Sequence, residues 1–142
     1  MQAIIRFAIA TNAALYRLTN GMVGGSLVGL NVLLLTTTGK LTGKPRTKPL
    51  CYFEEGRNYV VIASNGGADH HPAWFLNLKN DPAVRLRIKD AEFSAMAEVS
   101  DPKTRERLWQ KLITLSPHYI KYGKKTTRQI PMVLLHPHHL GQ

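Results

Sequence analysis

Apolar positions along this chain gather in six short segments that either alternate with polar residues or form brief apolar runs. Alternation with a period of two is typical of a half-buried strand, and a short apolar run bounded by turn residues is typical of a buried one. Two pairs of segments are separated only by short turns, at residues 54–57 and 89–90, and are predicted to be hairpins. The predicted strands are 30–38, 47–53, 58–64, 84–89, 92–99 and 130–136.

Helical periodicity appears at the start, in the middle and near the end of the chain. Residues 2–19 place apolar side chains near one stripe, which predicts an amphipathic N-terminal helix. A helix over 72–80 opens with proline, and another extends from an Asp101 cap through residue 115. Strands and helices do not alternate as in a doubly wound nucleotide fold. The predicted fold class is mainly β with flanking helices (α+β), built on a six-stranded antiparallel sheet closed or nearly closed into a small barrel.

Composition adds the size, the redox setting and the charge of the predicted barrel. With 142 residues, 44% of them hydrophobic, residues 1–142 are predicted to form a single domain. The single cysteine, Cys51, cannot form an intramolecular disulfide, so we expect a reducing, cytoplasmic setting. The net charge of +10 favours an anionic partner, which could be nucleic acid, an anionic membrane or a polyanionic small molecule.

The most distinctive motif is a basic loop over residues 39–46, which follows three threonines. It carries Lys40, Lys44 and Arg46 without an acidic residue, and its two glycines free the backbone to approach a ligand. Such a loop can bind phosphate, or it can be an ordinary solvated turn. It is not a Walker loop, because three residues instead of four separate its glycines.

Two further segments could line a pocket for a flat ring. Ala63-Ser64-Asn65-Gly66-Gly67 brings a strand of small residues to a glycine-rich end, where a ring can approach bare backbone. Trp74, on the following helix, could wall that ring or belong to the core. In 119–122, one helical turn would place Tyr119 and Tyr122 on the same face.

Other chemistries find no support in the sequence. The histidines lack metal-ligand spacing, so we predict no metal site, and no serine elbow is present. Cys51 lies in an apolar strand and is interpreted as a core residue rather than a nucleophile. The basic stretch from Lys103 to Arg128 leaves open a non-enzymatic nucleic-acid-binding domain, although no nucleic-acid motif accompanies it.

Three segments taken together resemble the deazaflavin-dependent nitroreductase family: LLLTTTGKLTGKPRTKPL, VIASNGGADHHPAWFLNLKNDP and YIKYGKKTTRQIPMVLL. The resemblance extends from about residue 15 to residue 135. It implies a split β-barrel like that of FMN-binding proteins, coenzyme F420 as cofactor and hydride transfer to a lipophilic electron acceptor. That acceptor would be a quinone, an activated alkene (enone) or a nitroaromatic.

The resemblance also implies roles for individual residues. The phosphate and acidic tail of the cofactor would be bound around the basic loop, by Thr38, Lys40, Lys44, Pro45, Arg46 and Thr47. The deazaflavin ring would lie against Ala63, Ser64, Asn65, Gly66, Trp74 and Asn77. Tyr119, Tyr122 and Ser64 are the candidate catalytic residues, since each could supply the proton that completes reduction.

Several alternatives stay open at this point. A split barrel could bind FMN instead of F420. Cys51 and Ser116 stand where nitroimidazole-reducing relatives carry tyrosines, which argues against the reduction of nitroimidazole drugs and leaves quinones and enones open. We expect a monomer or a homodimer without nucleic acid, and the N-terminal helix would allow peripheral contact at the inner face of the plasma membrane.

Overall fold

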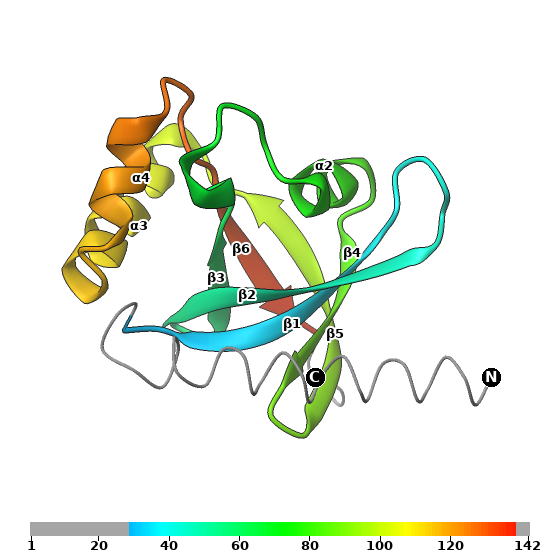
Figure 1. Ribbon diagram of the computed structural model, residues 1–142. Coiled ribbons are helices and arrows are strands. Elements are labelled where there is room, and N and C mark those ends of the chain that lie inside the picture. Colours follow the sequence, from blue (N-terminus) through cyan, green and yellow to red (C-terminus); the bar gives the residue numbers. More distant parts are fainter. Residues whose placement is uncertain (1–28, 139–142) are drawn as a thin grey trace.

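A closed six-stranded barrel forms the centre of the computed structural model, which describes residues 29–138 (Figure 1). The strand order is β1-β2-β3-β6-β5-β4, and every neighbouring pair is antiparallel. This arrangement confirms the predicted fold class; the predicted helix at 2–19 lies outside the described residues. The strands are β1 (Asn31–Thr38), β2 (Pro45–Glu55), β3 (Asn58–Ile62), β4 (Ala83–Ile88), β5 (Ala91–Val99) and β6 (Met132–Pro137).

Each strand has at least one boundary that differs from the prediction by one or two residues, and the structure gives a physical reason for two of these differences. β2 begins at Pro45 rather than at residue 47, because pairing with β1 continues to the register Thr38 opposite Pro45. Proline is tolerated as the first residue of a strand. β6 begins at Met132 rather than at residue 130, since Pro131 has no N–H to donate to a neighbouring strand.

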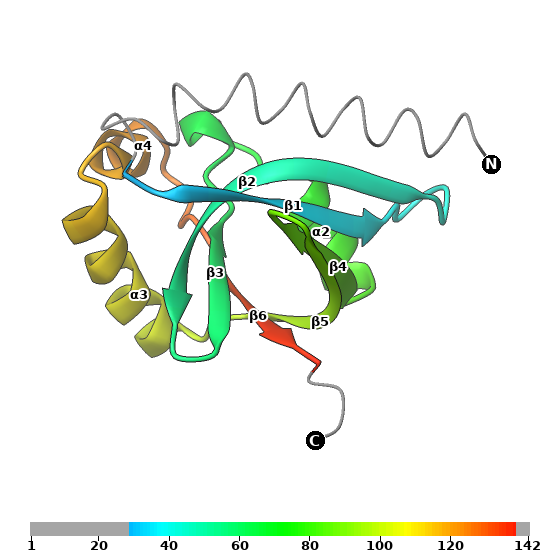
Figure 2. The same cartoon turned by 90° about the horizontal axis from the view of Figure 1, so that it is seen from below.

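The helices are α2 (Ala73–Asn80), α3 (Pro102–Leu115) and α4 (Tyr119–Lys125), with a short 3₁₀ turn, η1 (Asn65–Gly67). Asp101 caps α3 as predicted, accepting a hydrogen bond of 2.7 Å from the backbone N–H of Thr104. Figures 1 and 2 show α3 and α4 packed at one side of the barrel, whereas α2 lies apart from them.

Buried side chains form two clusters on the two faces of the sheet. Val61 and Val133 point into the barrel, where they meet Trp74, Phe75 and other residues that close one end from α2. The intervening residues of β3 and β6 pack on the opposite face against α3 and α4. Both faces of β3 and β6 are therefore buried, which explains why these strands read as apolar runs rather than as alternating patterns.

Candidate functional site

A groove of about 600 Å³ lies between the two helical parts of the molecule. Its walls come from β2, from the segment after β3, from the start of α2 and from Tyr119 of α4. The segment after β3 continues directly into α2, but more than ten positions separate it from the lining residues of β2, and Tyr119 follows much later in the chain, so the closed barrel brings these parts together. The lining residues are Lys48, Pro49, Leu50, Cys51, Ile62, Ser64, Asn65, Gly66, His70, His71, Pro72, Ala73, Trp74, Leu76 and Tyr119.

The segment after β3 has an unusual backbone. Asn65, Gly66 and Gly67 take left-handed conformations in succession, with φ of 47°, 64° and 82°. Asn65 secures the turn by donating its side-chain amide to the carbonyl oxygen of His70, at 3.1 Å. A 3₁₀ turn leaves its first N–H groups without partners inside the turn. The segment therefore gives the groove a floor of backbone; that this floor binds a polar ring stays a prediction.

Arg128, which follows α4, holds this segment from behind. Its guanidinium donates to the carbonyl oxygens of Ala68 at 2.8 Å, Ala63 at 3.2 Å and Ser64 at 2.8 Å. A fourth hydrogen bond of 3.0 Å joins it to Nδ1 of His71. Sequence reasoning counted Arg128 only as part of a basic stretch, because nothing local to that stretch reveals a contact with residues about 60 positions earlier.

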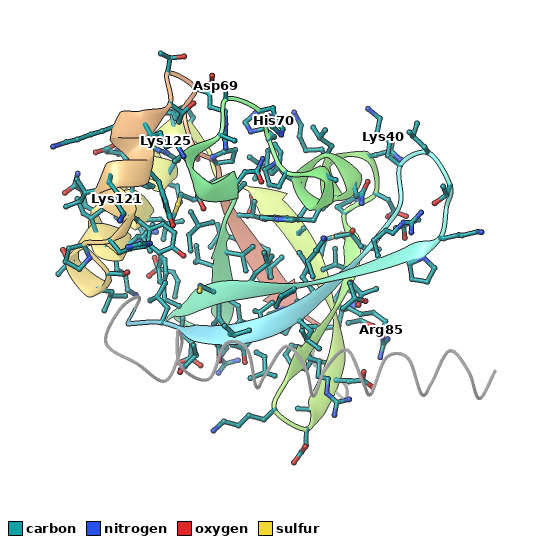
Figure 3. The ribbon with its side chains drawn as sticks, in the orientation of Figure 1. Lys40, Asp69, His70, Arg85, Lys121 and Lys125 are labelled. Carbon is teal, nitrogen blue, oxygen red and sulfur yellow. The ribbon has the colours of Figure 1, made fainter. Side chains whose placement is uncertain are left out.

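α4 supports the same segment at further points. The Lys125 ammonium donates to the carbonyl oxygen of Gly66 at 3.3 Å, and the Thr126 hydroxyl donates to the Asp69 carboxylate at 3.2 Å. A Cβ added at Gly67 would meet the Lys125 side chain at 2.9 Å, so this side chain packs closely against the backbone at Gly67. Figure 3 shows Lys125 and Asp69 on the facing elements.

Tyr119 and Cys51 form a hydrogen-bonded pair at the wall of the groove. Burial is the main cause that raises the pKa of both groups, and the neighbouring thiol raises the pKa of the Tyr119 phenol further. The phenol therefore keeps its proton and acts as a hydrogen-bond donor. Cys51 is half-buried: it packs against the core, in agreement with the sequence interpretation, and it also lines the groove.

Tyr122 occupies the same helical face as Tyr119, as predicted, with ring centroids 5.6 Å apart. Its hydroxyl is hydrogen-bonded to Nε2 of His118 at 2.9 Å, and it is not among the groove residues. Of the two tyrosines, only Tyr119 presents a side chain to the groove.

The basic loop is held in shape by its own backbone and by α2. The backbone N–H of Gly39 donates to Lys44 at 2.8 Å, closing the turn. The buried Asn77 side chain accepts from the Lys40 N–H at 3.0 Å and donates to the Thr37 hydroxyl at 3.2 Å. In the structure Asn77 anchors the loop and is not among the groove residues, and its predicted place beside the ring stays a prediction.

The cations of the basic loop are exposed and free of acidic neighbours. Across residues 29–138, Lys40, Lys44, Arg46 and Lys48 form no ion pair with a carboxylate. Arg46 and Lys48 lie on one face of β2, and Lys48 also lines the groove. Positive charge therefore extends from the loop, where Figure 3 shows Lys40, to the groove itself.

The structure gathers some of the predicted site residues and separates others. Ser64, Asn65, Gly66, Trp74 and Tyr119 line the groove, although the Trp74 ring is 6% exposed and also belongs to the core. Other predicted residues lie elsewhere: Ala63 is buried beneath the groove, Thr38 and Pro45 line a second groove of about 400 Å³ beside β4 and β5, and Thr47 pairs its hydroxyl with that of Thr36 at 2.7 Å.

The part of the chain that the structure describes has neither a cluster of metal ligands nor a helix suited to crossing a membrane. Within 29–138, no three His, Cys, Asp or Glu side chains are grouped so that they could hold a metal ion. None of the helices in that range is long and apolar enough to cross a membrane.

A small closed antiparallel barrel with a groove along its wall and a cationic loop beside it places the protein in the class of split-barrel proteins. The structure of an F420-H2 dependent reductase, FDR-A, is 35% identical, covers 73% of this chain and 92% of its own, and superposes with a TM-score of 0.67. The chain belongs to the F420H(2)-dependent quinone reductase family, which it matches over residues 8–137.

Relatives over most of the chain agree with this membership. The F420H(2)-dependent quinone reductase Rv1261c of Mycobacterium tuberculosis is 38% identical over 126 residues, which are 86% of this chain and 85% of the relative. A structure described as a domain-swapped dimer is 30% identical, covers 92% of this chain and 98% of its own, and has a TM-score of 0.68. These findings confirm the predicted F420-dependent oxidoreductase and its cofactor, with FMN a secondary alternative.

Proposed function

We propose that this protein uses reduced coenzyme F420 to reduce a quinone. The observation that carries the proposal is the continuity between the groove and the unpaired cations of the basic loop. A ligand with a flat ring at one end and several anionic groups at the other matches that arrangement. Family membership supports the same cofactor, and the name of the relative from Mycobacterium tuberculosis supports a quinone as acceptor.

The described residues fit the cofactor in charge and in shape. A phosphate and carboxylate tail needs cations that are not already neutralised, and Lys40, Lys44 and Arg46 meet that need. The ring needs an open backbone floor, and a Cβ added at Gly66 would meet nothing within 4 Å. The tail would be held by the loop, and the ring by the segment from Ser64 to Gly66.

When bound, the reduced deazaflavin supplies a hydride. The protein residues bind, orient and exclude water, so neither a nucleophile nor a metal is needed. When an acceptor is bound, the Tyr119 phenol, whose pKa burial raises, turns its O–H from Cys51 to a carbonyl oxygen of the acceptor and donates a hydrogen bond without giving up its proton. Ser64 offers a second hydroxyl in the same groove. The final proton then comes from water at the open side of the groove.

The apolar part of the groove supports a lipophilic acceptor. Pro49, Leu50, Ile62, Trp74 and Leu76 contribute apolar surface, and the Leu76 side chain is 42% exposed at the edge. A quinone combines a flat apolar ring with carbonyl oxygens that hydroxyl donors recognise. We propose enones and nitroaromatics as further acceptors, since they present the same combination of flat surface and polar oxygen.

A binding titration followed by an acceptor screen tests this function. The purified protein is titrated with oxidised F420 and, in parallel, with FMN, while fluorescence is recorded at low and moderate salt. We expect F420 to bind at micromolar or lower concentration and to weaken as salt rises. Reduced F420 should then be oxidised in the presence of menadione. Binding of FMN alone, or of neither compound, would refute the cofactor assignment.

Four assignments, which concern the partners and the location of the protein, are proposals. We propose a homodimer, supported by the domain-swapped dimer among the similar structures, and light scattering tests it. Peripheral membrane contact through residues 2–19 is testable by liposome flotation. The absence of nucleic-acid binding is supported by pairing within the basic stretch, where Arg107 and Lys111 both contact Glu55. A gel shift tests that absence, and cell fractionation tests the cytoplasmic location.

A further inference from the structure

Arg128 determines the shape of the groove floor although it is not a lining residue. Four of the five N–H donors of a guanidinium are used here, on three backbone carbonyl oxygens and one histidine ring. The carbonyl oxygens of Ala63, Ser64 and Ala68 are therefore directed toward Arg128, behind the segment. These three carbonyl oxygens therefore do not face the groove.

The contact with His71 fixes the position of a proton. A guanidinium has only N–H donors and no acceptor, so the Nδ1 atom that it contacts at 3.0 Å must accept. An accepting Nδ1 carries no hydrogen, and the proton of the neutral ring is then on Nε2. Burial, followed by the charges of Arg128 and Lys79, lowers the pKa of His71, which favours the same neutral form.

The His71 ring is held at the groove wall by packing as well. It lies over the Phe75 ring with centroids 4.8 Å apart and an interplanar angle of 50°. His71 lines the groove, and no residue between 29 and 138 forms a hydrogen bond with its Nε2 atom. The His71 ring packs on Phe75 and is hydrogen-bonded through Nδ1, so its Nε2–H is available to a ligand in the groove.

We propose that Arg128 holds His71 as the Nε2–H tautomer, so that His71 donates a hydrogen bond to a carbonyl oxygen of a ligand in the groove. This inference rests on the proposed function for the identity of the ligand, which offers carbonyl oxygens from two sources. One source is the pyrimidine part of the deazaflavin ring, and the other is the quinone. In either case Arg128 is a positioning residue that acts through His71.

The tautomer is measurable in the protein without any ligand. Nitrogen-15 NMR of histidine-labelled protein separates a ring nitrogen that carries a hydrogen from one that does not, and the spectrum of His71→Phe identifies the His71 signals by their loss. We expect an unprotonated Nδ1 and a protonated Nε2 in the wild type. In Arg128→Met we expect a mixture of tautomers, whereas a hydrogen on Nδ1 in the wild type would overturn the proposal.

Arg105→Met is the matched control. Arg105 is also a partly buried guanidinium that donates to a backbone carbonyl oxygen, that of Ile130 at 2.9 Å, but its other partners are Glu106 and the Trp109 ring rather than His71. Both variants lose an internal arginine, so both are expected to be less stable. Only Arg128→Met should alter the His71 signals. An equal change in both variants would assign Arg128 a purely structural role and overturn the proposal.

Ligand binding identifies the carbonyl source. His71→Phe keeps a flat ring over Phe75 without a donor, and His71→Gln restores an N–H near the position of Nε2. Loss of one hydrogen bond should weaken binding by about three- to tenfold. A raised Kd for F420 in His71→Phe would assign the His71 hydrogen bond to the deazaflavin. An unchanged Kd for F420 with a raised KM for menadione would assign it to the quinone. His71→Gln should recover part of either loss.

The outcomes separate this inference from the proposed function. If His71→Phe changes neither the F420 Kd nor the menadione KM by more than about twofold, His71 makes no ligand bond and the inference is wrong. If the wild type binds neither compound, the ligand part is overturned together with the proposed function. The NMR result decides the tautomer in that case also.

Discussion

Asn77 couples the basic loop to α2, and replacing it should damage both stability and cofactor binding. In Asn77→Leu, the Thr37 hydroxyl, 1% exposed, loses the donor that satisfies it. A buried polar group without a partner costs about 1–3 kcal/mol, and the lost bond to the Lys40 N–H, which water can replace, costs about 0.5–1 kcal/mol. The expected loss is about 1.5–4 kcal/mol of unfolding free energy, or roughly 1–2 M in the urea midpoint.

A double-mutant cycle makes the reasoning refutable. Thr37→Val alone should also destabilise, since it leaves the Asn77 amide without its acceptor. When both polar groups are replaced together, no unsatisfied partner remains, so the double variant should be more stable than the sum of the single losses by about 1 kcal/mol or more. Additivity within about 0.5 kcal/mol would show that the two side chains do not interact as described.

Cofactor affinity should follow a different pattern in the same variants. The Lys40 N–H loses its anchor whenever Asn77 is replaced, whether or not Thr37 is also replaced. Both Asn77→Leu and the double variant should therefore bind F420 several-fold more weakly, because the loop must be ordered on binding. Recovery of affinity together with stability in the double variant would contradict this account of the loop.

Three further predictions concern charge, the phenol and acid stability. Arg46→Ala should weaken F420 binding and reduce its salt dependence, whereas Lys103→Ala, the same change of charge at the start of α3, should alter neither in a fluorescence titration. Tyr119→Phe should lower kcat for menadione about tenfold with an F420 Kd unchanged within about twofold. Hydrogen bonds from Arg107 and Lys111 lower the pKa of Glu55 below its ordinary value of 4.5. Their stabilisation is therefore present above that pH and lost as the pH falls below it, so urea midpoints of Glu55→Gln should fall short of the wild type at pH 7 and converge with it in acid.

The barrel was predictable because its information is local and periodic. The turn at 54–57, with Gly56 at a φ of 61°, and the turn at 89–90, with Lys89 at a φ of 55°, each join strands whose apolar pattern is visible without the fold. Asp101 followed by Pro102 likewise indicates the start of α3. Errors were confined to strand ends, where pairing with a neighbouring strand extends or shortens an element.

The site was predictable only where its residues belong to a compact motif. Gly66 and the basic loop are recognisable because glycines and cations cluster in sequence. The roles of Asn77 and Arg128 were not recognisable, since each depends on partners that the closed barrel brings together. Position 77 is 37 residues from the Lys40 N–H that it accepts, and position 128 is 57 residues from His71. No local pattern specifies which distant carbonyl group a side chain will meet.

Because Arg128 lies near the end of the chain, the cofactor groove can be completed only late in the synthesis of the protein. Synthesis delivers the basic loop, Ser64 and Trp74 long before it delivers Arg128 and β6, and β3 has no second neighbour until β6 pairs with it. A nascent chain that stops short of residue 128 therefore carries the recognisable cofactor motifs without the brace that shapes them. Because such a chain lacks the complete groove, the coenzyme has no site to bind on it. The coenzyme therefore protects only completed molecules from unfolding and proteolysis.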